Sequence, residues 1–131
     1  MDFDTVQSSQ IFKAHSMSSL ANTPVPPYYT VIFSSIRSDT DAGYNATAQR
    51  MVELAMEQPG YLGIESAKNE IGITVSYWQD LDSIKQWKQH AEHLQAQKLG
   101  HQKWYDAFVV RIARVEKEYS MKRPAGTDPE A

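Results

Sequence analysis

YLGIESAKNEIGITVSYW, which runs from Tyr61 to Trp78, is the stretch of this sequence that decides the fold. Two runs within it, Tyr61 to Ala67 and Ile71 to Trp78, are rich in β-branched and aromatic residues, which favour strands. The polar residues between them, Lys68-Asn69-Glu70, suit a short turn. The stretch therefore predicts a β-hairpin.

Helices are expected on both sides of this hairpin. Apolar residues recur at helical spacing over residues 42–58, and they do so again downstream of the hairpin as far as about Leu99. Pro59-Gly60 ends the first helix, and Gly100 ends the second. The side chains expected to cap the two amino ends are Asp39 or Asp41 for the first helix and Asp80 or Asp82 for the second.

Two outer strands complete the pattern. Tyr28 to Arg37 (YYTVIFSSIR) is β-branched and aromatic, and Trp104 and Tyr105 introduce a last strand from about Ala107 to Tyr119. The resulting order, strand-helix-strand-strand-helix-strand, is that of the split βαβ arrangement. We therefore predict an α+β, ferredoxin-like domain with a four-stranded antiparallel sheet and both helices on one face.

The two ends of the chain show neither the helical nor the strand spacing of apolar residues. Residues 1–27 are rich in Ser and close with a cluster of prolines, so we expect a flexible leader there. Residues 122–131 are similarly rich in turn residues, and we expect a flexible tail. The residues between them, 28–121, are expected to form one domain, which suits a chain of 131 residues.

The composition excludes several classes of function. The chain has no cysteine, which removes thiolate chemistry and favours a cytoplasmic location. Its net charge of -3 gives no general attraction to phosphate, so we expect no nucleic-acid partner. With 41% hydrophobic and 22% charged residues, we expect no membrane partner either. The sequence also lacks a Gly-rich phosphate loop, a serine nucleophile elbow and a dinucleotide-binding fingerprint.

The first strand has an unusual pattern for a sheet with one solvated face. Such strands alternate apolar with charged residues, yet from Tyr28 to Ile36 neither set of alternating residues carries a charge. One face packs on the helices, and the other needs a cover that so short a chain does not contain. We therefore predict a homodimer that is joined through the sheet faces.

Four segments carry a family resemblance over residues 26–121. They are PGYLGIESA (59–67), GITVSYW (72–78), IKQWKQHAEHLQAQ (84–97) and WYDAFVVRIARVEKEY (104–119). In this order and spacing they resemble the antibiotic biosynthesis monooxygenase-like family of dimeric α+β barrels, and especially its small bacterial members of unassigned function. The resemblance implies the predicted fold and a pocket between helix and sheet for a flat, conjugated ligand. It does not choose among the activities that proteins of this shape have.

Four residues are candidates for binding a substrate in that pocket. Trp87 lies on the inward stripe of the second helix, where a pocket wall and a simple core position are both reasonable interpretations. Trp104, Tyr77 and Ser34 supply indole, phenol and hydroxyl groups that can contact or hydrogen-bond an aromatic ligand.

His90 and His93 are the candidate catalytic bases. They are three residues apart on the second helix, and His90 is also three residues from Trp87. An imidazole with a pKa of about 6.5 can accept a phenolic proton at neutral pH. The alternative is that both are polar residues on a solvated helix face. We predict no metal site, because two histidines are only part of a zinc ligand set.

The first functional hypothesis is a monooxygenase that acts on a small aromatic or quinol-type substrate and uses no cofactor. The deprotonated substrate would supply the electrons, and the protein would supply a dry pocket, orientation and a base. The alternatives are a non-catalytic dimeric binder of a small hydrophobic metabolite and a haem-degrading monooxygenase. For haem, the resemblance implies a ligating His where this chain has Gln97, and an Asn where it has Phe33 or Ser34, so we expect no haem binding.

Overall fold

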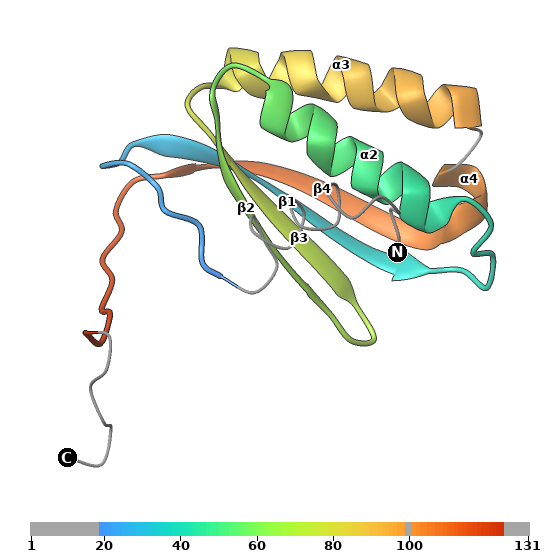
Figure 1. The fold of residues 1–131 in the computed structure, drawn as a ribbon, viewed down its shortest axis with the longest axis horizontal. Coiled ribbons are helices and arrows are strands. Elements are labelled where there is room, and N and C mark those ends of the chain that lie inside the picture. The colour runs from blue at the N-terminus through green and yellow to red at the C-terminus, as the bar shows by residue number, and fades with distance from the viewer. Residues whose placement is uncertain (1–18, 99–100, 125–131) are drawn as a thin grey trace.

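Four antiparallel strands form one sheet, and two long helices cover one of its faces (Figure 1). The arrangement is taken from a computed structural model that describes residues 19–98 and 101–124, without the side chains of residues 94–98, 101 and 102. The predicted ferredoxin-like order is confirmed. Its elements are β1 (Tyr28–Arg37), α2 (Tyr44–Glu57), β2 (Tyr61–Lys68), β3 (Gly72–Trp78), α3 (Leu81–Lys98), α4 (His101–Trp104) and β4 (Tyr105–Val115).

The strand order β2-β3-β1-β4 gives the sheet two faces of different composition. We call the side under the helices the inner face and the opposite side the outer face. The register places Val31 of β1 between Ser76 of β3 and Ile112 of β4 on the inner face. The neighbouring residue Ile32 lies between Val75 and Arg111 on the outer face.

The core lies between the inner face and the helices. Val31, Ala55, Trp78 and Ile84 form a buried apolar cluster, in which Trp78 is 0% exposed. The Trp78 indole N–H donates to the hydroxyl oxygen of Ser76 at 2.9 Å, so the ring is buried without leaving a polar atom unpaired.

The two long helices begin in different ways. The Asp80 carboxylate accepts a hydrogen bond from the Ser83 backbone N–H at 2.8 Å, so Asp80 caps α3 as predicted. That bond holds the pKa of Asp80 below its usual value. At α2 the N-cap is Gly43 in a left-handed conformation with φ of 79°, and no side chain caps the helix.

The predicted capping of α2 by Asp39 or Asp41 is therefore wrong. The Asp41 carboxylate is drawn instead to Arg37, whose guanidinium donates to it at 2.7 Å. The predicted ends of the second helix, Leu99 and Gly100, lie outside the described residues.

The last strand starts and ends earlier than predicted, and the short helix α4 precedes it. β4 starts at Tyr105 because this residue already pairs with Arg37 at the end of β1, after a register shift. It ends at Val115 because Val115 pairs with Tyr28, the first residue of β1. Residues 116–124 then extend away from the sheet (Figure 1).

The described part of the predicted leader, residues 19–27, lies against the sheet and the segment after β4. The Ala21 backbone N–H donates to the Glu65 carboxylate at 2.8 Å, and the Thr23 hydroxyl donates to Glu118 at 2.7 Å. The Glu118 carboxylate also accepts a hydrogen bond from Tyr28, and these bonds lower the pKa of Glu118. Residues 1–18 of the predicted leader and 125–131 of the predicted tail lie outside the described residues.

Candidate functional site

A cavity of about 700 Å³ lies between the inner face of the sheet and the two long helices. Its walls are largely apolar and aromatic, and they include Val31, Phe33 and Val110 from the sheet with Ala55 and Ile84 from the helices. Hollows of this size with apolar walls and a few polar groups are typical of small-molecule sites. We therefore take this cavity as the candidate functional site.

Trp87 lines the cavity, as predicted, and is also part of the core. Its ring is tilted by 33° against the ring of Trp78, with 5.5 Å between the two centroids. The indole N–H of Trp87 is buried and has no acceptor among the described residues. A buried donor without an acceptor costs free energy, so a ligand oxygen that accepts from this atom would be stabilised.

Trp104 lines the same cavity but uses its polar atom within the fold. Its indole N–H donates to the backbone oxygen of Ala42 at 2.9 Å, and the side chain is 4% exposed. The ring meets Tyr44 edge-on with 5.7 Å between centroids. Trp104 can therefore offer its ring to a ligand, and its N–H is committed to the fold.

Tyr77 and Ser34 are absent from the cavity wall because they lie on the outer face. Ser34 pairs with Ile73, and Tyr77 pairs with Thr30. Ile73 and Thr30 both belong to the outer face. The Tyr77 hydroxyl donates to the Glu65 carboxylate at 2.8 Å, and burial together with this bond raises the pKa of Tyr77. Since successive residues of a strand alternate between faces, Trp78 faces the core and its neighbour Tyr77 does not.

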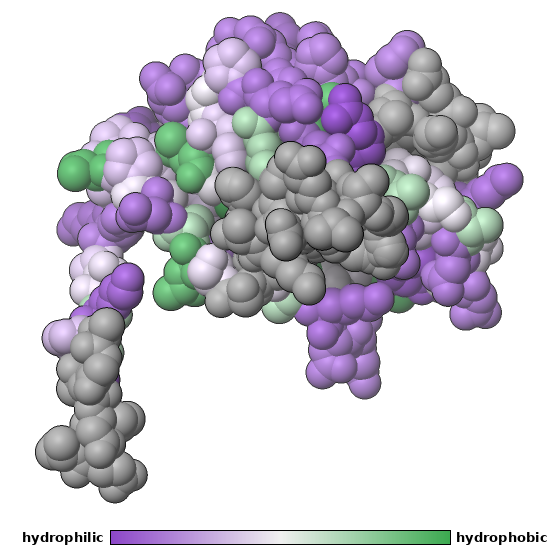
Figure 2. Space-filling view, in the orientation of Figure 1, coloured by the Kyte–Doolittle hydropathy of each residue, from purple (hydrophilic) through white to green (hydrophobic). Residues whose placement is uncertain are grey.

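His90 and His93 are exposed on α3 and do not line the cavity. The helix presents Ile84, Trp87 and Ala91 to the cavity. The side of α3 that faces away from the sheet is covered by hydrophilic residues (Figure 2). The structure therefore does not bring the two histidines to the candidate site, and their role as bases stays a prediction.

The cavity wall also contains polar side chains that are not among the six predicted site residues, and four of them form two pairs. Tyr44 and Tyr105 meet at the α4 end of the cavity, where their hydroxyl oxygens are 3.4 Å apart. Lys88 and Glu92 form an ion pair of 3.3 Å at the exposed edge of α3. No local sequence pattern could join Tyr44 to Tyr105, because the two residues are 61 positions apart.

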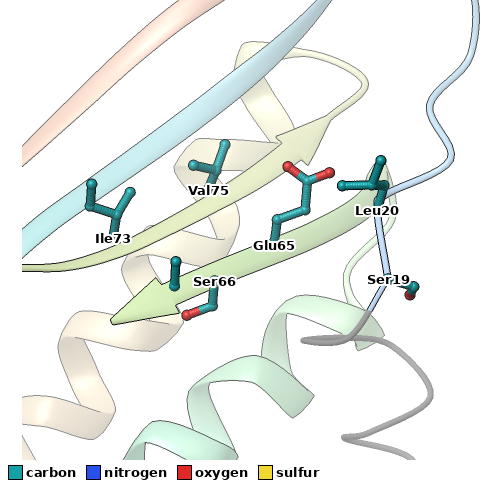
Figure 3. Close-up of a pocket in the computed structure, with 7 residues that line it drawn as sticks. Ser19, Leu20, Glu65, Ser66, Ile73 and Val75 are labelled. Carbon is teal, nitrogen blue, oxygen red and sulfur yellow. The ribbon is translucent and has the colours of Figure 1, made fainter. Parts of the chain in front are cut away.

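A second, shallower hollow of about 430 Å³ lies beside residues 19 and 20 (Figure 3). Ile73 and Val75 of β3 form part of its wall, together with Glu65 of β2. None of the six predicted site residues lines it.

Two further searches cover the described residues only. Among them, no three or more His, Asp and Glu side chains gather as they would to hold a metal ion. None of the described helices is long and apolar enough to cross a membrane.

The family of the chain follows from two comparisons. Residues 27–99 match the antibiotic biosynthesis monooxygenase family. The chain is also 50% identical over 104 residues to the uncharacterized protein YqjZ of Bacillus subtilis (strain 168), an alignment that covers 78% of this chain and 91% of that protein. The chain therefore belongs to the antibiotic biosynthesis monooxygenase family.

Solved structures with the same fold are more distant in sequence. PA3566 from Pseudomonas aeruginosa superposes with a TM-score of 0.55 at 14% identity, covering 73% of this chain and 99% of that one. SnoaB, a cofactor-independent oxygenase from Streptomyces nogalater, gives a TM-score of 0.51 at 12% identity, covering 75% and 100%. At these identities the likeness concerns the fold.

Proposed function

We propose that this protein is a monooxygenase that binds no cofactor and oxidises a small aromatic or quinol-type substrate in the cavity under its two helices. The observation that carries the proposal is the buried indole N–H of Trp87, which lies in the wall of an aromatic cavity of about 700 Å³ and finds no acceptor in the part of the chain that the structure describes. A substrate with a carbonyl or phenol oxygen would satisfy that donor while its ring contacts the aromatic walls. Membership of the family and the fold shared with a cofactor-independent oxygenase also support it.

The reaction balances without an external reductant. A quinol and one O₂ would give a hydroxylated quinone and one water, so one oxygen atom enters the ring and the substrate supplies all four electrons. The protein would exclude water, orient the ring and stabilise the oxygen from which a proton leaves. Glu92 is a carboxylate at the cavity edge that could take this proton, although its ion pair with Lys88 lowers its availability.

We further propose that two copies of the chain pack through their outer faces, as the sequence predicts. Ile36, Ile73 and Val109 are 47%, 41% and 47% exposed on that face in the single chain. Covering these side chains with a second sheet would remove apolar surface from water, which is the usual driving force of a homodimer.

A non-catalytic binder of a small hydrophobic metabolite is the second candidate. The absence of any His among the described residues that line the cavity favours it, because such a wall can hold a ring yet lacks the residue best suited to take its proton. Turnover distinguishes the two candidates.

The test is oxygen uptake by the purified protein with a panel of quinols and hydroxynaphthalenes. We expect one O₂ to be consumed per substrate and a product heavier by one oxygen and lighter by two hydrogens. Trp87→Phe keeps an aromatic ring and removes the N–H, so it should weaken substrate binding by about 2- to 10-fold. Tyr61→Phe is the matched control, since Tyr61 packs against the core and does not line the cavity. Tight binding of a panel member without uptake would favour the non-catalytic binder.

A further inference from the structure

Two phenol groups from distant parts of the chain meet at one end of the cavity. Tyr44, at the start of α2, and Tyr105, at the start of β4, both line the wall, and the Tyr105 O–H donates to the Tyr44 oxygen at 3.4 Å. This distance is long for a bond between two hydroxyls. The Tyr44 oxygen is the acceptor of this bond, which leaves its own O–H to donate to a ligand beside the cavity.

A cation lies against the ring of Tyr44. The guanidinium carbon of Arg37 is 3.3 Å from the centre of that ring, and the Arg37 side chain is 16% exposed. The group is fixed there because it donates to the backbone oxygens of Trp104 at 3.0 Å and Thr40 at 3.1 Å. Its carboxylate partner, Asp41, is 88% exposed, so water screens the negative charge while the positive charge faces the ring.

The same end of the cavity has flat aromatic walls. Phe33 and Phe108 are stacked with 5.5 Å between centroids and an angle of 30°. Tyr105 meets both rings edge-on, at 5.4 Å from Phe33 and 5.8 Å from Phe108. Such a wall favours a planar conjugated ring whose oxygen points toward the two hydroxyls.

We infer that Tyr44 and Tyr105, with Arg37 behind Tyr44, form a binding site for the anionic oxygen of a deprotonated aromatic substrate, a phenolate or enolate. The inference rests on the proposed function and adds the protonation state in which the substrate is held. A cation over the face of a phenol polarises its O–H and makes it a stronger donor. The Tyr44 O–H is the donor that this cation strengthens, and the Tyr105 O–H can turn from the long bond with Tyr44 to the substrate oxygen. Donors placed where negative charge develops stabilise the anion that must form before O₂ can react.

The Tyr105 hydroxyl remains a donor at neutral pH. Burial and the bond to Tyr44 raise the pKa of Tyr105 above its usual value, while the nearby Arg37 opposes this shift. The Tyr105 phenol therefore keeps its proton when a substrate anion is present. Lys68, Lys88 and Glu92 are the other charged groups of the described wall, and Lys88 and Glu92 pair with each other.

The experiment uses two probes of nearly equal size in the full-length protein. The first is 2-hydroxy-1,4-naphthoquinone, which is an anion at neutral pH, and the second is its neutral methyl ether, 2-methoxy-1,4-naphthoquinone. We expect wild type to bind the anion about tenfold more tightly, the ratio that one hydrogen bond to a charged group provides. In Tyr44→Phe/Tyr105→Phe, which keeps both rings, the ratio should fall to about one.

Tyr61→Phe is again the matched control, and it should keep the wild-type ratio. Equal binding of both probes by wild type, or an unchanged ratio in the double variant with wild-type stability to urea, would overturn the inference. Oxygen uptake is measured separately on the same proteins. A preference for the anion without oxygen uptake would support this site and reject the proposed monooxygenase. Oxygen uptake without a preference for the anion would support the monooxygenase and reject this site.

Discussion

The two faces of the sheet are built from adjacent residues of the same strands and differ in what covers them. On the inner face Trp78 is fully buried under the helices, and on the outer face its neighbour Tyr77 bonds to Glu65 of the next strand. Among the described residues, the Trp87 N–H under the helices has no acceptor, and the outer face exposes apolar side chains of three strands, whereas the exposed apolar side chains of the inner face are confined to β4, where Phe108, Val110 and Ile112 line the cavity. The difference indicates two kinds of missing partner, a polar aromatic ligand inside and an apolar protein surface outside.

The largest expected effect is on the inner face. Trp78→Ala removes a ring that is 0% exposed and packs against both Tyr61 and Trp87. It should lower the free energy of unfolding in urea by about 3–5 kcal/mol. Ile71→Ala, at a position 52% exposed beside the β2–β3 turn, should change it by no more than about 0.5 kcal/mol. Equal losses would show that the inner face is not the main core.

The next effect tests the outer face. Ile73→Glu places a charge on an outer-face side chain that is 41% exposed in the single chain. If two outer faces pack together, burying that carboxylate is unfavourable and the dimer should dissociate. Light scattering should then report 14.9 kDa in place of twice 14.9 kDa. Leu81→Glu, at an exposed position at the start of α3, should leave the mass unchanged. A folded monomer in wild type would reject the predicted interface.

A smaller effect concerns the pH dependence of stability. Burial raises the pKa of Tyr61 from 10.0 to about 12, so the folded chain holds this proton more tightly than the unfolded chain. The stability that results is complete below pH 10 and is lost as the pH rises toward 12. The urea midpoint of Tyr61→Phe should therefore fall less than that of wild type over this interval. Tyr119→Phe, at a residue 98% exposed, should follow wild type.

The smallest effect is expected on the exposed side of α3. If His90 takes the substrate proton, as the sequence predicts, His90→Ala lowers the oxygen-uptake rate. Its exposed position outside the cavity wall leads us to expect an unchanged rate and an unchanged affinity for the aromatic probes. A tenfold loss of rate with normal stability would restore the prediction from the sequence and contradict the site geometry.

Local patterns were enough to predict the fold. The hairpin, the Asp80 cap and the position of Trp87 each depend on residues within a few positions of one another. The resemblance of four segments to a known family agreed with these patterns. The ends of β4 could not be predicted in this way, because they depend on where β1 begins and ends.

The candidate site was only partly predictable for the same reason. Periodicity places Tyr77 and Trp78 on opposite faces, but it does not say which face the helices cover. His90 follows Trp87 by three residues, which places the two side chains about 60° apart around the helix. This angle is small enough to suggest a shared side, yet it is enough to turn His90 away from the cavity. The Tyr44–Tyr105 pair joins residues 61 positions apart, and only the folded sheet brings them together.

Native mass spectrometry with 2-hydroxy-1,4-naphthoquinone tests most directly whether the two faces have separate partners. The account predicts a wild-type dimer with one probe per chain, an Ile73→Glu monomer that still carries one probe, and a Trp87→Phe dimer with reduced occupancy. Loss of the probe in Ile73→Glu together with full occupancy in Trp87→Phe would place the ligand on the outer face and contradict the account.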